Sequence, residues 1–219
     1  MIDLSKRGVM KNILCFGDSN TYGRIPLTKS GERFERNQRW PGILNNMLGE
    51  EYHIIEEGLG GRTSVISDQV EGIMSGLEYI TPCLRSHAPL DLVIVQLGTN
   101  DMKARYSLSP VDVALGVERV ISTIFSTKEC KEAKVLALVP LYINDVNHFK
   151  FHEMFEGGDI KSRKLSPLFF DMENRYENLW VLDPSPSISP SKKDGIHLDL
   201  LGHKAMASLV FDKVKEIGL

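Results

Sequence analysis

The sequence predicts an α/β protein: a five-stranded parallel sheet with helices on both faces, similar in class to a flavodoxin. The first observation is a set of five short runs of Val, Ile and Leu, each closed by Gly or Pro, which is typical of strands buried on both faces. The second is the length of the segments between these runs, which leaves room for a helical crossover each time. The third is the total of 219 residues, 42% of them hydrophobic, which suits one domain with a sizeable core. We therefore expect a single α/β/α sandwich domain over residues 1–219.

The expected strands follow one another along the chain as continuous apolar segments. Each is short, and each ends where a glycine, proline or polar cluster begins. They are ILCFG at 13–17, HIIEE at 53–57, DLVIVQLG at 91–98, KVLALVP at 134–140 and LWVLDP at 179–184.

Helical periodicity marks the intervening segments most clearly in two places. Residues 109–125 carry one apolar stripe, and Ser109 can cap its start with Pro110 in the first helical position. Residues 206–217 carry a second apolar stripe, and Asp199 is suited to be the N-cap of that last helix. The Trp40-Pro41 pair predicts a further helix start.

Two segments do not follow this alternation of strands and helices. Residues 22–40 are polar and end at Trp40. Residues 140–160 lack clear periodicity and carry Phe149, Phe151 and Phe155 among polar residues, so we expect an inserted loop. An aromatic segment of this kind is expected to form a pocket wall, a subunit contact, or both.

Composition excludes several classes of protein. The net charge is −3 with mixed signs, so neither a nucleic-acid partner nor a membrane surface is expected. The three cysteines stand far apart without CxxC spacing, which fits a reducing compartment. Because the N-terminal segment lacks the apolar run of a signal peptide and no membrane span is present, we expect a cytoplasmic protein.

Polar side chains follow four of the predicted strands, at the edge where a parallel sheet binds its ligands. Ser19 follows the first strand, the Gly60-Gly61 turn the second, and Asn100 the third. The last strand is followed by Asp194-Gly195-Ile196-His197. These are the parts that acyl transfer needs: a nucleophile, a base, a group that orients the base, and donors for an oxyanion.

Each candidate has a physical role. A serine hydroxyl is a weak nucleophile until a neighbouring imidazole removes its proton, and His197 can supply that imidazole. Asp194, three residues earlier, can hold the His197 tautomer. The Ser19 N–H, an N–H in the Gly60-Gly61 turn and the Asn100 side-chain amide are the candidate oxyanion donors. Asp18 is expected to form a turn and Asp101 to cap the segment after it.

These segments resemble the four sequence blocks of the SGNH (GDSL-type) hydrolases. They are GDSN at 17–20, GGRTS at 60–64, GTND at 98–101 and DGIH at 194–197. Any one block is a weak signal, but all four match in order and spacing over nearly the whole chain. The resemblance implies a serine esterase in which Ser19, Asp194 and His197 form the triad. It also implies that Ser19, Gly61 and Asn100 form the oxyanion hole, with Gly60 as the adjacent alternative to Gly61.

A narrower likeness joins the chain to bacterial arylesterases and acyltransferases that act on short acyl groups. It depends on Arg39-Trp40, on Glu56-Glu57-Gly58, on Lys103 and on FEGG at 155–158. The resemblance implies a small-molecule ester substrate and a homo-oligomer joined through the insertion before FEGG. The expected substrate-binding residues are Tyr22, Trp40, Gly60, Lys103, Phe151, Phe155 and Ile196.

Two other functions stay open at this point. A carbohydrate esterase that removes acetyl groups would use the same triad and differ only in the shape of its pocket. A phosphate- or nucleotide-binding module would use GDSNTYG as an anion cradle, but it would leave Asp194 and His197 without a role, and neither a Walker lysine nor GxGxxG is present. No cofactor and no metal are expected, since only the loose His148/His152 pair approaches ligand spacing.

Overall fold

The computed structural model describes residues 10–28, 31–144 and 149–219, and its centre is a five-stranded parallel sheet. The strand order is β2-β1-β3-β4-β5, with every neighbouring pair parallel. The predicted fold class is therefore confirmed. The strands are β1 (Lys11–Gly17), β2 (Tyr52–Gly58), β3 (Leu92–Gln96), β4 (Lys134–Leu138) and β5 (Leu179–Leu182).

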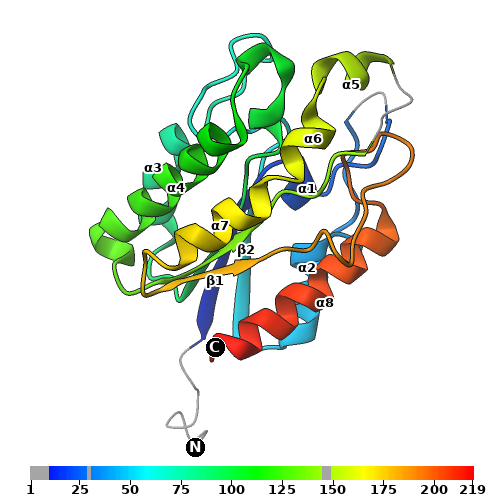
Figure 1. The fold of residues 1–219 in the computed structure, drawn as a ribbon. Coiled ribbons are helices and arrows are strands. Elements are labelled where there is room, and N and C mark those ends of the chain that lie inside the picture. Colours follow the sequence, from blue (N-terminus) through cyan, green and yellow to red (C-terminus); the bar gives the residue numbers. More distant parts are fainter. Residues whose placement is uncertain (1–9, 29–30, 145–148) are drawn as a thin grey trace, which may run out of the picture.

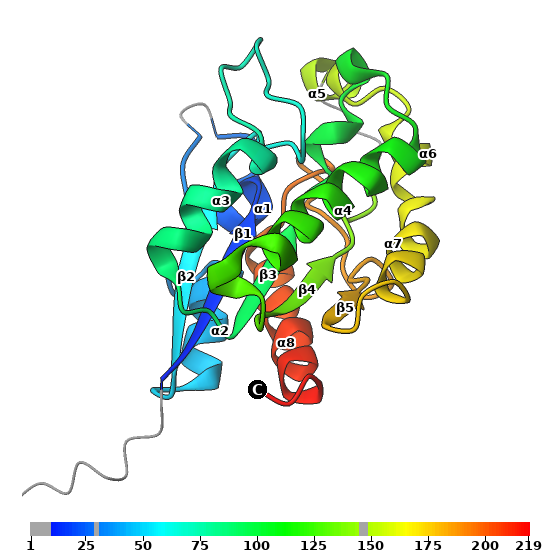
Figure 2. The same cartoon turned by 90° about the vertical axis from the view of Figure 1, so that its left-hand side faces the viewer.

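Helices cover both faces of the sheet (Figures 1 and 2). On one face lie α3 (Gly76–His87), α4 (Pro110–Ser126) and α7 (Leu165–Glu173), and on the other lie α2 (Trp40–Leu48) and α8 (Leu200–Glu216). Three shorter helices lie at the carboxyl edge of the sheet: α1 (Ser19–Tyr22), α5 (Phe149–Met154) and α6 (Gly158–Ser162). No helix in the described part of the chain is long and apolar enough to cross a membrane.

Successive side chains of each strand point alternately into two separate hydrophobic cores, one on each face of the sheet. In β1, Leu14 and Phe16 pack toward α3 and α4, whereas Ile13 and Cys15 pack toward α2 and α8. All four are fully buried. This alternation is the two-residue period of a strand, and burial on both faces explains why the strands appear in the sequence as continuous apolar runs.

Helix starts follow the local chemistry that the sequence indicated. The Ser109 hydroxyl accepts the Asp112 N–H, and the Asp112 carboxylate accepts the Ser109 N–H, which completes a capping box for α4. Asp199 caps α8 by accepting the Gly202 N–H at 2.9 Å. Helix α2 begins at Trp40, directly before Pro41, as expected.

The irregular segments differ from the sequence expectation. Residues 140–160 are not a plain loop, because α5 and most of α6 lie within or next to them. Phe155 is only 6% exposed and Phe151 is half-buried, so these two side chains do not form an exposed aromatic patch on the chain; the side chain of Phe149 lies outside the described residues. Short helices with few residues per apolar stripe give a weak periodic signal, which is why α5 and α6 were not predicted.

Candidate active site

Ser19 lies at the end of β1, where the strand order reverses between β1 and β3. Crevices at such switch points are the usual ligand sites of open α/β sheets. Asp18 caps the short helix α1 by accepting the Asn20 N–H at 2.9 Å, so Ser19 is the first residue of that helix. Helix α1 fits closely over the strand ends because Gly58 has no side chain: a Cβ there would come within 2.2 Å of the Tyr22 nitrogen.

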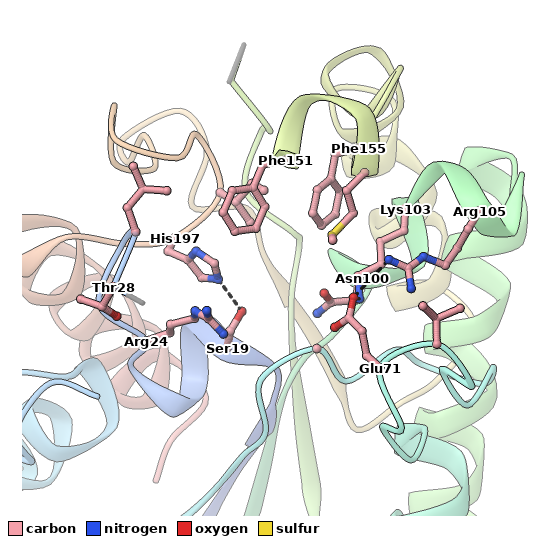
Figure 3. A pocket seen from close by; sticks show the side chains of 15 residues that line it. Ser19, Arg24, Thr28, Glu71, Asn100, Lys103, Arg105, Phe151, Phe155 and His197 are labelled. Carbon is pink, nitrogen blue, oxygen red and sulfur yellow. Dashed lines mark hydrogen bonds and ion pairs between the residues drawn. The ribbon is translucent and has the colours of Figure 1, made fainter. Parts of the chain in front are cut away.

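His197 contacts both Ser19 and Asp194 (Figure 3). Its Nε2 lies 2.9 Å from Ser19 Oγ, and its Nδ1 lies 2.8 Å from Asp194 Oδ2. The second oxygen of Asp194 accepts the N–H groups of Ile196 and His197, at 3.1 and 3.0 Å. Burial opposes ionisation of Asp194, but the hydrogen bond and charge of His197 and the two backbone donors hold its pKa below the usual value.

Asn20 fixes the His197 segment to helix α1, a role that no sequence pattern predicted. Its Nδ2 donates to the Ile196 carbonyl at 3.2 Å, and its Oδ1 accepts the Leu198 N–H at 2.9 Å. The side-chain amide thus pairs with the backbone on both sides of His197. The only sequence signal was an amide directly after Ser19, where an apolar residue would serve equally well for packing.

Two further groups predicted as oxyanion donors line the same pocket as Ser19: Gly61 and Asn100. Gly61 has a φ of +81°, a conformation that glycine adopts without strain. The Asn100 Nδ2 donates to the Arg62 carbonyl at 3.1 Å, which orients the amide and leaves its second hydrogen for a ligand. Gly60 does not line the pocket, so the geometry favours Gly61 of the two adjacent glycines.

Asp101 joins two of the four blocks instead of capping the segment after it. Both of its oxygens accept the Ser64 N–H, at 2.9 and 3.0 Å, and the Ser64 hydroxyl also donates to it. The carboxylate therefore ties the 60–64 turn to the 98–101 turn, and so holds Gly61 and Asn100 in a fixed relation. Burial raises the pKa of Asp101, and burial also raises that of Asp18, to about 6.

The pocket has a volume of about 720 Å³ and brings together four of the seven predicted substrate-binding residues. Phe151, Met154 and Phe155 form an apolar part of the pocket lining. Figure 3 shows Phe151 above His197 and Phe155 above Asn100, and the Phe151 ring lies 6.3 Å from the His197 ring. The predicted residues that line the pocket are Lys103, Phe151, Phe155 and Ile196.

Tyr22, Trp40 and Gly60 are the predicted substrate-binding residues that the structure places elsewhere. Trp40 is fully buried, and its indole N–H donates to Gln96 Oε1 at 3.2 Å. The same Gln96 oxygen accepts a hydrogen bond from the Thr21 hydroxyl at 2.6 Å. Trp40 is therefore connected through Gln96 to Thr21 of α1, and its role is structural support of that helix. Tyr22 does not line the pocket; the Arg33 guanidinium lies over its ring, with Arg33 Cζ 4.4 Å from the ring centroid.

The wall opposite His197 carries charges that balance one another. Lys103 Nζ lies 3.1 Å from Asp68 Oδ2 and 2.8 Å from Glu71 Oε1. Arg105 contacts the same two carboxylates, each at 3.2 Å. Lys103 is only 1% exposed, so a buried ammonium is held here by two carboxylates. Asp68 and Glu71 could not be recognised as partners of Lys103 in advance, because they lie in an irregular segment.

One group of possible metal ligands lies within the described residues, away from this pocket. Donor atoms of Glu57, Cys83 and His87 lie within 4.8 Å of one another. Glu57 and His87 already contact each other at 2.9 Å. Of the His148/His152 pair considered from the sequence, His148 lies outside the described residues.

The family model for GDSL-like lipases and acylhydrolases matches residues 15–205, a range that includes all four blocks. The chain belongs to this family. The enzyme is accordingly a carboxylic ester hydrolase, and the resemblance inferred from the four blocks is confirmed. A comparison with curated proteins gives no match.

Solved structures similar to this hydrolase carry the same fold. The native aryl esterase of M. smegmatis is 34% identical, with 94% of this chain and 99% of that chain covered and a TM-score of 0.88. A carbohydrate acetylesterase from Sinorhizobium meliloti has the same identity, coverage and TM-score. A protein described as a putative arylesterase from Agrobacterium tumefaciens is 29% identical over 95% of this chain and 100% of that chain, with a TM-score of 0.85.

Proposed function

We propose that this hydrolase cleaves esters of short carboxylic acids through an acyl-enzyme formed on Ser19. In the first step Ser19 Oγ attacks the ester carbonyl carbon while His197 Nε2 takes the hydroxyl proton. The carbon–oxygen bond to the alcohol then breaks, and His197 returns the proton to the departing oxygen. Water repeats the sequence and releases the acid. Asp194 holds the ring orientation and stabilises the imidazolium.

The negative charge that develops on the carbonyl oxygen needs donors that are already in place. Within this proposal the donors are the N–H groups of Ser19 and Gly61 and the free amide hydrogen of Asn100. Each such donor typically contributes about 3–4 kcal/mol to transition-state stabilisation. The Asp101–Ser64 contacts support the proposal, because they hold the two turns that carry Gly61 and Asn100.

Preference for a short acyl group is supported by the apolar wall close to the reacting atoms. The Phe151 ring lies edge-on to the His197 ring, and Phe155 is packed into the core cluster behind it. Because this wall is packed against the protein interior, it limits the chain length that fits beside Ser19. The M. smegmatis relative described as an aryl esterase agrees with a small ester substrate.

The observation that carries the proposal is the unbroken set of contacts from Ser19 Oγ to His197 and on to Asp194. Ser19→Ala is expected to abolish hydrolysis of 4-nitrophenyl acetate, because nothing remains to form the acyl-enzyme. Ser208→Ala, which removes an exposed hydroxyl on α8, is the matched control and should keep the wild-type rate. A serine-directed phosphonate followed by peptide mapping should label Ser19 in the wild type.

Two results would contradict this assignment. The first is a correctly folded Ser19→Ala protein that still hydrolyses the ester at a comparable rate. The second is labelling at a serine other than Ser19. Circular dichroism of both variants would show that any loss of rate does not come from unfolding.

A second candidate substrate is an acetylated carbohydrate. The polar side chains along the pocket favour it, since Arg24, Thr28 and Glu71 could hydrogen-bond sugar hydroxyls. The S. meliloti relatives described as carbohydrate acetylesterases agree with it. Comparing kcat/KM for acetylated xylose and for 4-nitrophenyl acetate, each with and without added alcohol, would separate the two substrates and would show whether water or alcohol is the preferred acceptor.

We further propose that the hydrolase forms a homo-oligomer. The exposed apolar side chains of Leu27 and Val70 support this, since both also line the pocket and so mark its mouth as a surface that an adjacent copy could cover.

A further inference from the structure

One cation in the pocket has no counter-charge among the described residues. Arg24 lines the pocket together with Ser19 and His197, and its side chain is half-buried. Within residues 10–28, 31–144 and 149–219, the hydrogen bond of Arg24 is that of its backbone N–H, and its guanidinium makes no hydrogen bond and no ion pair. Lys103 and Arg105, in contrast, are both neutralised by Asp68 and Glu71. Among the described residues that line the pocket, the net charge presented to a ligand therefore comes from Arg24.

The backbone of Arg24 is fixed next to the reacting serine. Its N–H donates to the Ser19 carbonyl at 3.0 Å, and the residue forms an antiparallel bridge with Arg33. The guanidinium lies beside Gly31, where a Cβ would come to 3.6 Å from Nη1. Arg24 is thus a side chain on an anchored backbone, which is what a binding group requires.

The position of Arg24 in the pocket indicates which part of a bound ester its guanidinium would contact. Figure 3 shows Arg24, Thr28 and His197 on one side of the pocket, with Asn100 and Glu71 on the other. In the proposed reaction the alcohol oxygen leaves beside His197, which protonates it, while the carbonyl oxygen lies beside Asn100. The alcohol part of the substrate therefore extends toward Arg24.

A half-buried guanidinium is well suited to one kind of ligand group. Its planar fork of donors matches a carboxylate, with which it can form two parallel hydrogen bonds. Partial burial strengthens such a pair relative to one in bulk water, because the local dielectric is lower.

We propose that Arg24 forms an anion subsite, and that the preferred substrates are short-chain esters whose alcohol part carries a carboxylate. The inference rests on the proposed function, since it assigns the alcohol side of the pocket from the roles of His197 and Asn100.

Esters in matched pairs test the subsite. The first pair is (4-acetoxyphenyl)acetate and its methyl ester, which differ in charge at a distance from the reacting bond. Arg24→Gln should lower kcat/KM for the charged ester by at least about tenfold more than for the methyl ester, mainly through KM, because the interaction is present before the transition state. Arg119→Gln on the exposed face of α4 makes the same change in net charge and should leave the ratio at its wild-type value.

A second pair places the carboxylate in the acyl part: mono(4-nitrophenyl) glutarate and its methyl ester. If Arg24→Gln lowered the preference for the charged ester over the neutral one in this second pair only, the assignment of the subsite to the alcohol side would be overturned. If Arg24→Gln lowered kcat/KM equally for charged and neutral esters, or did not lower it at all, the proposed subsite would be overturned.

Binding of the product 4-hydroxyphenylacetate, measured by calorimetry, tests the subsite without turnover. The dissociation constant should be about tenfold weaker in Arg24→Gln than in the wild type, and an unchanged value would overturn the subsite. If the wild type bound this product with the expected dependence on Arg24 but hydrolysed no ester, the proposed function would fail and the subsite would stand.

Discussion

At the scale of single residues, the arrangement around His197 depends on a side chain that takes no part in the chemistry. Asn20 follows Ser19 directly and is 3% exposed, and its amide bonds the backbone on both sides of His197. Ser19 and His197, the proposed nucleophile and base, lie 178 residues apart in the chain, so the separation of 2.9 Å between Ser19 Oγ and His197 Nε2 needs a local connection. Asn20 provides it with two hydrogen bonds.

Replacing Asn20 should therefore affect catalysis more than binding. Asn20→Leu keeps the side-chain volume but removes both hydrogen bonds, so the His197 segment can shift relative to Ser19. We expect kcat for 4-nitrophenyl acetate to fall about tenfold to 100-fold with KM nearly unchanged, because a small misplacement of reacting groups has effects of this size. Steady-state kinetics of the wild type and the variant measure kcat and KM separately.

Asn174→Leu is the matched control, since Asn174 is an exposed amide at the end of α7. It should leave both constants at their wild-type values. If Asn20→Leu raised KM and kept kcat, Asn20 would be a binding residue and the positioning role would be wrong.

At the scale of the elements, helices α2 and α8 are joined by a buried histidine outside the pocket. The Trp40 N–H, at the start of α2, donates to His203 Nδ1 at 3.3 Å. His203 therefore accepts at Nδ1 and carries its proton on Nε2, which has no hydrogen-bond partner among the described residues. The Phe34 ring lies edge-on at 5.2 Å. Burial lowers the pKa of His203 to about 4, with smaller effects from Asp199, His197 and Arg39.

This helix contact should make stability depend on pH. The unfolded chain binds a proton at His203 below about pH 6.5, and the folded chain binds it only near pH 4. Stability due to His203 is thus lost as pH falls from about 6.5 to 4, by up to about 3 kcal/mol. The raised pKa of Asp18 acts in the opposite direction over about pH 4 to 6, since the folded state there holds the extra proton.

His203→Phe should separate the two effects. The variant loses an acceptor, which lowers its stability by an amount independent of pH, about 1–3 kcal/mol. The difference in unfolding free energy between wild type and variant should then shrink steadily from pH 6.5 to pH 4.5 in urea titrations. His53→Gln, at an exposed position, is the control and should show no such trend. A difference that stayed constant with pH would refute the titration of His203.

At the scale of the whole molecule, the sheet explains what could be predicted from the sequence. Strands buried on both faces are continuous apolar runs, and the residues after them must meet at one edge, so Ser19, Gly61, Asn100 and His197 could be placed together in advance. The pocket walls could be predicted only in part: Lys103, Phe151, Phe155 and Ile196 line the pocket as expected, whereas Arg24 and Glu71 were not found. Arg24 and Glu71 lie in irregular segments, where no periodicity tells which way a side chain points, and Asn20 lies in the four-residue helix α1, which is too short to show a periodicity. Trp40 was misplaced for a related reason: an aromatic residue at a helix start packs equally well inward or toward a ligand, and only the Gln96 contact decides it.

The mouth of the pocket is also the surface through which we propose that the chains associate. The proposed oligomer cannot depend on an exposed aromatic patch, since Phe155 is buried and Phe151 faces the pocket. The exposed apolar side chains at the pocket mouth are Leu27, 41% exposed, and Val70, 78% exposed, on two different loops. An oligomer that buried them would also narrow the entrance to Ser19.

Light scattering of the wild type at micromolar concentration should therefore give a mass that is a multiple of the 24.6 kDa chain. The double change Leu27→Ser and Val70→Ser should shift the mass toward the monomer, because it removes the apolar area that association would bury. It should also raise the rate for long acyl esters relative to short ones, as the entrance opens. Leu115→Ser, on the outer face of α4, is the matched control and should alter neither quantity. A monomeric wild type would refute the oligomer, and a double variant that stayed oligomeric would place the interface elsewhere on the surface.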